Sequence, residues 1–119
     1  MLNKALELAK SLPYERGKQR VAAIAVDKRG RVLSAKTNSY TCTHPKQKHY
    51  AERAGNKHKN FLHAEIRCII SAQKVNGGKI HKLYVARSNK VGEHLPSRPC
   101  CICQLAISEA NIQEVIYYE

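Results

Sequence analysis

The sequence lacks any apolar run of the length that a membrane-spanning helix requires, which is roughly 18 to 20 residues. Residues 1–10 intersperse Lys and Glu among Leu and Ala, so they also lack the continuous apolar block of a secretory signal peptide. No internal repeat and no linker-like stretch interrupts the chain. We therefore expect one soluble domain over residues 1–119, located in the cytoplasm and without a membrane partner.

Acidic residues are scarce: 9 Asp and Glu stand against 21 Lys and Arg, which gives a net charge of +12. The 43% hydrophobic content argues against disorder over most of the chain and suffices for one core without disulfide bonds. The five cysteines are odd in number, and three of them lie at positions 100, 101 and 103. This pattern favours a reducing compartment and a metal over a secreted disulfide framework.

Apolar periodicity predicts helices at residues 2–12, 62–74 and 100–110, and strands at residues 21–26, 32–35, 80–86 and 115–118. Asn76-Gly77-Gly78 is expected to close the second helix. We interpret residues 39–60 as a long basic loop with room for one helical turn at residues 50–54. Alternating helices and strands predict an α/β fold, a three-layer α/β/α sandwich whose mixed sheet has about four strands, the last of them parallel.

Two short motifs are expected where a loop enters a helix, His63-Ala64-Glu65 and Pro99-Cys100-Cys101-Ile102-Cys103. Cys100 and Cys103 are three positions apart, so a helix places both sulfurs on one side, and its N-terminus favours thiolates. Taken alone, the two cysteines would fit a redox pair or two small buried side chains equally well.

His63 adds a third ligand to this pair. Two thiolates and a neutral imidazole match a catalytic zinc site, in which three protein ligands leave one position for water. Glu65, two residues after His63, is placed to accept a proton from that water, although an acid in a first helical turn is also favourable without any catalysis. The sequence therefore predicts Zn²⁺ held by His63, Cys100 and Cys103, with Glu65 as the catalytic residue.

The two motifs together resemble the zinc-dependent cytidine and deoxycytidylate deaminase superfamily, whose pattern is H-x-E followed by P-C-x-x-C. The order of the elements agrees with that family over nearly the whole chain. A looser similarity, carried by Lys36-Thr37-Asn38-Ser39 and Thr43-His44-Pro45, is to small deoxycytidylate-deaminase-like proteins of tailed phages. Most members continue into a fifth strand and further helices, so substrate choice and oligomer contacts stay open, although we expect a homo-oligomer.

The resemblance implies hydrolysis of a cytosine amine, with ammonia and a uracil compound as products. Glu65 would carry protons from water to the ring nitrogen and to the departing ammonia. The Ala64 N–H would donate to the pyrimidine carbonyl. Asn38 would contact the sugar hydroxyl, although an asparagine that forms a turn at a strand end explains the same residue as well.

The charge leaves the substrate open. A free nucleotide, dCMP first, needs one or two cations, which Arg98, Lys46 or Lys48 would provide. A single strand of DNA or RNA, deaminated at cytosine or, in RNA, at adenosine, would instead use the basic loop with Tyr40 and Tyr50. The charge also fits ordinary surface. A non-catalytic, zinc-stabilised nucleic-acid-binding module is a third alternative, which the lack of an evident fourth protein ligand disfavours.

For the other cysteines and histidines, the sequence favours roles that do not involve a metal. A second metal site in the 39–60 loop would use Cys42, His44, His49 and His58, but their spacing matches no standard site, so a solvated loop is the preferred interpretation. Cys101 is expected to point away from the zinc, because it lies about 100° around the helix from its neighbours. Cys68 is expected in the core.

Overall fold

The structure, a computed structural model, describes residues 1–55, 61–75 and 79–119. Its elements are, in chain order, α1 (Leu2–Lys10), β1 (Arg20–Val26), β2 (Val32–Thr37), α2 (Pro45–Arg53), α3 (Ala64–Gln73), β3 (Lys82–Ser88), β4 (His94–Leu95), α4 (Cys101–Glu109) and β5 (Glu114–Tyr117).

The five strands form one mixed sheet in which β1 and β3 are neighbours at the centre. β1 runs antiparallel to both β2 and β3, and β4 pairs antiparallel with the end of β3. β5 lies parallel to β3, which confirms the expected parallel pair. The homo-oligomer suggested by the sequence stays a prediction.

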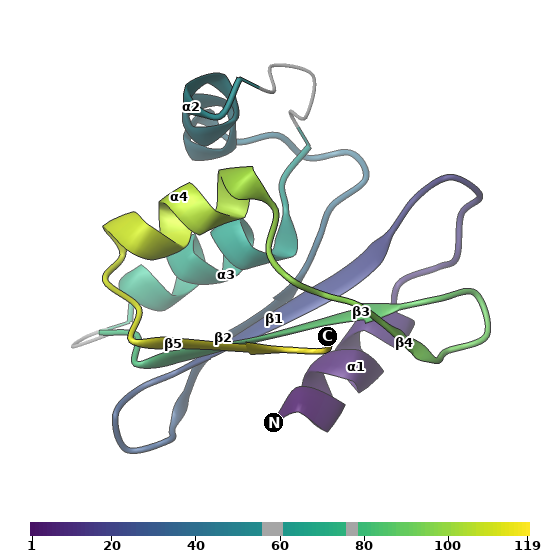
Figure 1. Ribbon diagram of the computed structural model, residues 1–119, viewed down its shortest axis with the longest axis horizontal. Coiled ribbons are helices and arrows are strands. Elements are labelled where there is room, and N and C mark those ends of the chain that lie inside the picture. The colour runs from purple at the N-terminus through teal and green to yellow at the C-terminus, as the bar shows by residue number, and fades with distance from the viewer. Residues whose placement is uncertain (56–60, 76–78) are drawn as a thin grey trace.

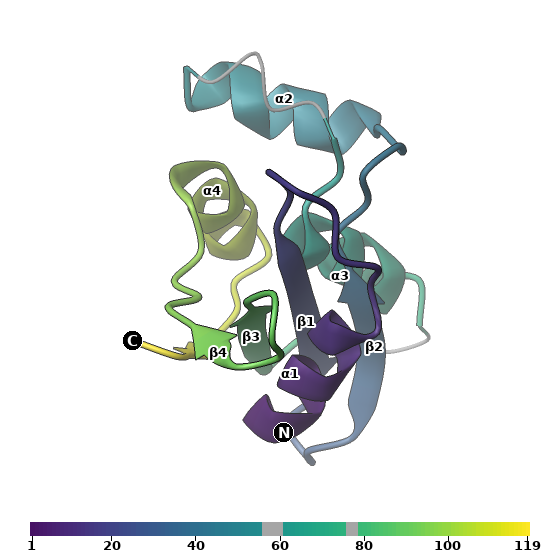
Figure 2. The same cartoon turned by 90° about the vertical axis from the view of Figure 1, so that its right-hand side faces the viewer.

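Side chains on the two faces of the sheet enter different cores, because successive strand residues point to opposite sides. Along β1, Ala23 and Ala25 belong to the larger core shared with α3 and α4. Ile24 and Val26 pack instead with Ala5 of α1. Figures 1 and 2 show α1 on one side of the sheet and α3 with α4 on the other. The predicted α/β/α sandwich is confirmed, with five strands in place of about four.

The strand boundaries differ from expectation where the periodic signal is short. β3 spans Lys82–Ser88 instead of residues 80–86. It continues through Arg87 and Ser88 because both residues pair with β1 on one side and with β4 on the other. The segment between the predicted strand at residues 80–86 and the predicted helix at residues 100–110 contains β4, which is two residues long and too short to show alternation. The predicted Asn-Gly-Gly cap at 76–78 lies outside the described residues.

The interpretation of residues 39–60 as a loop is wrong for its central part, because Pro45–Arg53 forms helix α2. Pro45 suits a first helical turn, and His44 Nδ1 accepts a hydrogen bond from the Lys46 N–H at 3.0 Å. The buried face consists of Gln47 and Ala51, one turn apart. Because one of its two buried residues is a glutamine, this helix lacks the apolar periodicity by which the other helices were predicted.

All helices of the described chain are short. The longest, α3, has 10 residues. Among residues 1–55, 61–75 and 79–119, no helix combines the length and the apolarity needed to cross a bilayer.

Arg20 connects α1 to the ends of both central strands. From the first position of β1, its guanidinium donates to the carbonyls of Lys10 and Leu12 at 3.2 Å each. It also donates to Ser88 Oγ at 3.2 Å and to the Asn89 carbonyl. The residue is 8% exposed. Because the last carbonyls of a helix have no partner within it, Arg20 supplies donors to part-buried carbonyls at the end of α1 and to the buried Ser88 hydroxyl.

Replacing Arg20 should therefore destabilise the fold. We expect Arg20→Met to lower the free energy of unfolding by about 1 to 3 kcal/mol, since several buried acceptors lose a charged donor. Urea unfolding followed by circular dichroism measures this. The matched control is Arg29→Met, in the exposed turn after β1, where a change within about 0.5 kcal/mol is expected. Equal stabilities of the two variants would contradict the role of Arg20.

Candidate metal centre and active-site pocket

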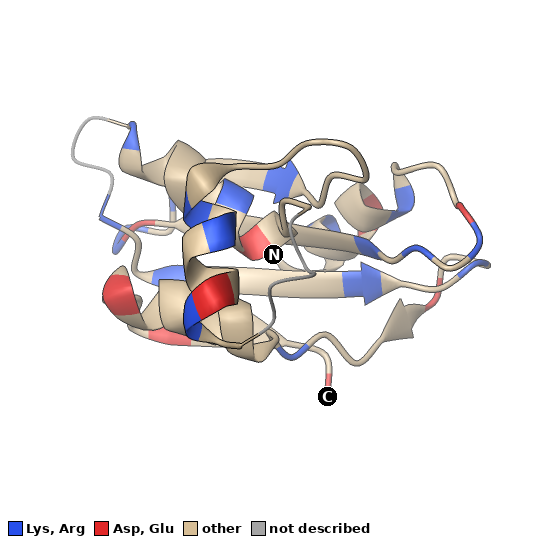
Figure 3. Cartoon of the chain, turned by 90° about the horizontal axis from the view of Figure 1, so that it is seen from above, with Lys and Arg blue, Asp and Glu red and all other residues tan. Residues whose placement is uncertain are grey.

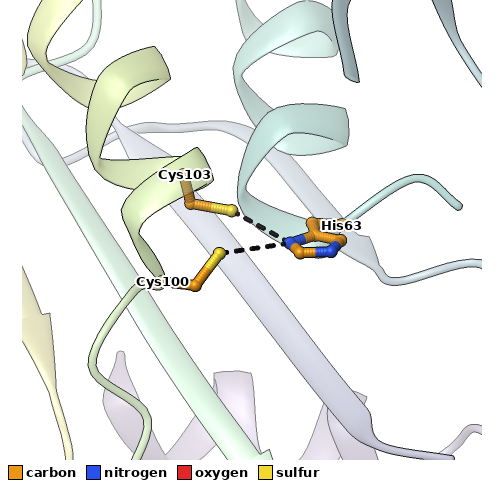
Figure 4. Close-up of side chains that lie close together, drawn as sticks. All are labelled: His63, Cys100 and Cys103. Carbon is orange, nitrogen blue, oxygen red and sulfur yellow. Dashed lines mark hydrogen bonds between the residues drawn. The ribbon is translucent and has the colours of Figure 1, made fainter. Parts of the chain in front are cut away.

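Two helix N-termini meet at the candidate site. His63 is the N-cap residue of α3 and Cys100 is the N-cap residue of α4, so both lie where a loop enters a helix. Cys103 follows in the first turn of α4. His63 Nδ1 is 3.3 Å from Cys103 Sγ and 3.5 Å from Cys100 Sγ. Figure 4 shows both sulfurs directed at the same ring nitrogen.

The three donor atoms fit a tetrahedral zinc site. All of them lie within 4.8 Å of one another. Zinc bonds of about 2.0 Å to nitrogen and about 2.3 Å to sulfur separate the nitrogen from each sulfur by about 3.5 Å at the tetrahedral angle, close to the 3.3 and 3.5 Å observed. Within the described part of the chain, this is the one group of three or more such side chains. One imidazole and two sulfurs also leave the fourth position free for water.

The two sulfurs of this group differ in their tendency to ionise. The hydrogen bond from Cys103, and next the one from His63, lowers the pKa of Cys100 to about 3 against the opposing effect of burial. The bond to Cys100 and burial raise the pKa of Cys103 well above its ordinary value. Of the two sulfurs, Cys100 therefore ionises more readily, and a cysteine that coordinates a metal does so as the thiolate.

Glu65 lies beside this donor group in the first turn of α3. It is only 6% exposed, yet it lines the same pocket as His63 and Cys100. Burial raises the pKa of the Glu65 carboxyl above its usual range, because the charged form loses hydration. A carboxyl group in such surroundings is suited to accept and return a proton.

A pocket of about 370 Å³ opens beside the donor group. It lies between the starts of α3 and α4 and the ends of the central strands. Its walls are formed by Gln19, Val21, Asn38, His63, Ala64, Glu65, Arg87, Pro96, Ser97, Arg98 and Cys100. Three residues predicted to bind substrate, Asn38, Ala64 and Arg98, thus share one pocket with Glu65. Their contacts with a substrate stay predictions.

Lys46 and Lys48, also predicted to bind substrate, are not among the residues that line this pocket. Both belong to α2, and Lys46 lines a separate pocket of about 240 Å³ together with Tyr50 and Glu109. The segment folds as a helix beside α4 instead of lying as a loop across the site. Figure 3 shows the basic residues on several elements, α2 among them, and not in one stripe.

Asn38 and Ala64 present polar groups at the pocket wall. Asn38 Oδ1 accepts from the Val21 N–H at 2.8 Å, and its Nδ2 donates to the Gln19 carbonyl at 3.0 Å. These bonds fit the structural role that the sequence left open for Asn38, and the amide retains a second lone pair and a second N–H for a ligand. Ala64 is the first residue of α3, so its N–H has no partner within the helix.

Gln47 is a site residue that the sequence did not reveal. It is fully buried in α2, and its Oε1 accepts a hydrogen bond from the His63 backbone N–H at 3.2 Å. The bond fixes the backbone that carries a metal ligand, as supporting residues around metal sites commonly do. Nothing in a single sequence distinguishes a buried glutamine from an exposed one.

Gln19, Arg87 and Ser97 also line the pocket and were not predicted. The sequence pattern could have identified Arg87, because this residue continues the alternating series of Leu83 and Val85, which both belong to the core. A cation at the end of such a series indicates a polar site at that end of the strand.

The remaining cysteines and histidines lie outside the donor group. Cys68 is buried and Cys101 is exposed, both as expected. In the proposed second metal site, His44 caps α2 and Cys42 is exposed, while His58 lies outside the described residues. The described residues contain no second group of metal-ligating side chains, and a metal in this segment stays the untested alternative that the sequence disfavoured.

The geometry predicts about one zinc ion per chain, bound by the donor group. Cys100→Ser should lose most of the zinc, because the pKa of a serine hydroxyl is too high for it to replace the thiolate. The matched control is Cys101→Ser, which changes the neighbouring sulfur outside the donor group and should retain the metal. Elemental analysis of the purified proteins measures the ratio. Loss of zinc from both variants to the same extent would contradict the assignment.

Comparisons with known proteins agree with this site. The family model described as "Cytidine and deoxycytidylate deaminase zinc-binding region" matches residues 1–119. The crystal structure of cytidine deaminase from Mycobacterium tuberculosis is similar with a TM-score of 0.63 and 19% identity, covering 100% of this chain and 81% of that one. A variant of the same enzyme with one glutamate replaced by glutamine gives 0.61 and 20%, covering 100% and 82%.

At these identities the structural matches establish the fold alone. The comparison with curated proteins finds no match. The family model and the His63, Cys100 and Cys103 group confirm zinc as the cofactor predicted from the sequence. Because the family model spans the whole sequence, this chain belongs to the cytidine and deoxycytidylate deaminase zinc-binding family.

Proposed function

We propose that this chain is a hydrolytic deaminase that converts a cytosine nucleotide, with dCMP as the first candidate, to its uracil form and ammonia. The observation that carries the proposal is the shared pocket, in which the buried Glu65 carboxyl lies beside the ligands His63 and Cys100. Family membership supports the reaction class.

Each step of the proposed reaction is assigned to particular residues of this chain. Zinc held by His63, Cys100 and Cys103 would act as a Lewis acid that makes a water more acidic and more nucleophilic. Glu65 accepts one proton of the attacking water on a carboxylate oxygen and delivers it to the ring nitrogen. It then takes the remaining proton from the added hydroxyl group and passes it to the amine, which departs as ammonia as the new carbonyl forms. The Ala64 N–H at the start of α3 donates to the pyrimidine carbonyl and holds the ring in place.

A free nucleotide is the preferred substrate because of what surrounds the pocket. A volume of about 370 Å³ lies in the range of small-molecule sites. Arg98, exposed at the pocket wall, offers a cation for a phosphate. Asn38 at the same wall suits a sugar hydroxyl.

The alternative of a polynucleotide strand has less support. Strand-binding proteins use open aromatic faces for base stacking. Here Lys18 lies over the Tyr40 ring, with its Nζ 5.0 Å from the centroid, and Lys90 lies 5.9 Å from the centroid of Tyr14. One face of each ring is therefore already covered. A purely structural zinc site is disfavoured as well, because it would not need a buried carboxyl in a pocket beside three ligands.

If Glu65 carries protons and is not a zinc ligand, replacing it should remove most of the activity without loss of zinc. Glu65→Gln keeps the size of the side chain but cannot carry the proton, so kcat should fall by about 100-fold or more. Zinc content should stay unchanged, because Glu65 is not a ligand. Ammonia release and elemental analysis on the same preparation measure both quantities. A fully active variant would remove the proposed mechanism.

The substrate class is tested by ammonia release from a panel of potential substrates. The panel contains cytidine, deoxycytidine, their mono- and triphosphates, a single-stranded DNA oligomer and an RNA. We expect the highest kcat/KM for dCMP, because a phosphate gains charge-assisted hydrogen bonds that a nucleoside cannot make. Activity on oligomers but on no monomer would overturn the nucleotide proposal in favour of a strand.

A further inference from the structure

Arg87 occupies an unusual position for a charged side chain. It lies on β3, one of the two central strands, and continues the series Leu83 and Val85 on the face that carries the larger core. Its register partner on β1 is Val21, which packs against the same core. The alternation therefore turns Arg87 towards α3 and α4, the side on which the metal-ligand group lies.

At this position Arg87 enters the wall of the active-site pocket. It is half-buried and lines the pocket together with His63 and Glu65. Within the described residues, the ion pairs of the structure do not include Arg87, and no hydrogen bond to its guanidinium is found. Arg20, by contrast, donates from its terminal nitrogens to backbone carbonyls and to Ser88.

A second cation, Arg98, lines the same pocket from the loop before α4. It is exposed, and it too lacks an ion-pair partner among the described residues. Neither guanidinium has a carboxylate as ion-pair partner among the described residues, so both can bind an anion that enters the pocket. A neutral nucleoside would leave this charge uncompensated, whereas a phosphate accepts the paired N–H groups of arginine.

We propose that Arg87 binds the phosphate group of the substrate and thereby makes the enzyme prefer a cytosine nucleotide to the nucleoside. This inference rests on the proposed function, because it assigns the substrate class of the same pocket. Arg87 supplies the half-buried contact and Arg98 the exposed one. The half-buried group discriminates more strongly, because its charge is less screened by solvent.

The test compares Arg87→Met with the wild-type protein and with Arg29→Met, all zinc-loaded. Arg29 lies in the turn beyond the opposite end of β1, so its replacement removes the same charge far from the pocket. The readout is the ratio of kcat/KM for dCMP to kcat/KM for deoxycytidine. In Arg87→Met this ratio should fall by about 10- to 100-fold, which corresponds to the loss of one charge-assisted hydrogen-bonding group. In Arg29→Met it should stay within about twofold of wild type.

Arg87→Lys distinguishes phosphate binding from a packing role. It keeps the charge but loses the fork of the guanidinium, so the ratio should lie between those of wild type and Arg87→Met. Thermal unfolding of each variant checks that the fold is retained. An unchanged ratio in Arg87→Met would overturn the inference while leaving deaminase activity in place. A parallel loss for dCMP and deoxycytidine would also overturn it, since the residue would then act on the site as a whole.

Calorimetric binding of dCMP and deoxycytidine to the same proteins separates this inference from the proposed function. If wild type binds dCMP more tightly in an Arg87-dependent manner but releases no ammonia, the phosphate contact stands and the proposed reaction fails. A third outcome is that the protein deaminates a DNA oligomer but not dCMP, and that Arg87→Met loses this activity. Arg87 would then bind a phosphodiester of the strand, and the assignment of a free nucleotide as substrate would fail. Equal binding of dCMP by wild type and Arg87→Met would overturn the contact itself.

Discussion

The convergence of two helix N-termini at one end of the sheet is the constraint on which the rest of the site depends. His63 and Cys100 cap α3 and α4, and their donor atoms reach within hydrogen-bonding distance only because both helices pack on the same face of β1 and β3. The packing is carried by fully buried side chains such as Ile66 and Ile102. The partial positive charge of both helix ends favours thiolates and anionic ligands at this place.

The pocket follows from the same arrangement, because the ends of β1 and β3 form its wall opposite the helices. Arg20 ties these strand ends to α1, and Asn38 bonds the start of β1. Gln47 reaches the metal-ligand segment from α2, so a helix outside the three layers also helps to hold His63. Residues around the pocket are therefore held by hydrogen bonds from several separate elements, which is how preorganised sites are usually supported.

The net charge of +12 has different meanings in different parts of the molecule. On α2 the basic residues lie beside a polar cluster in which Arg53 pairs with Glu109 at 3.5 Å. At the loops next to the pocket, lysines lie over tyrosine rings. Arg87 and Arg98 differ from these, because they line a pocket and have no ion-pair partner in the described part of the chain. The location and the ion-pair partners of each basic residue therefore say more about the substrate than the total charge does.

The sequence by itself determined the α/β/α sandwich and the metal-ligand group, because apolar periodicity and the H-x-E and P-C-x-x-C spacings are local signals of burial and coordination. It did not reveal α2, whose buried face is centred on Gln47 and carries little apolar pattern. It did not show that Lys46 and Lys48 belong to α2 and lie outside the lining of the pocket beside the donor group, or that Arg87 lines that pocket. Only the tertiary structure decided these points, because a charged or amide side chain has the same local pattern whether it faces solvent, a neighbouring helix or a pocket. The surroundings of such a side chain are set by segments distant in the sequence.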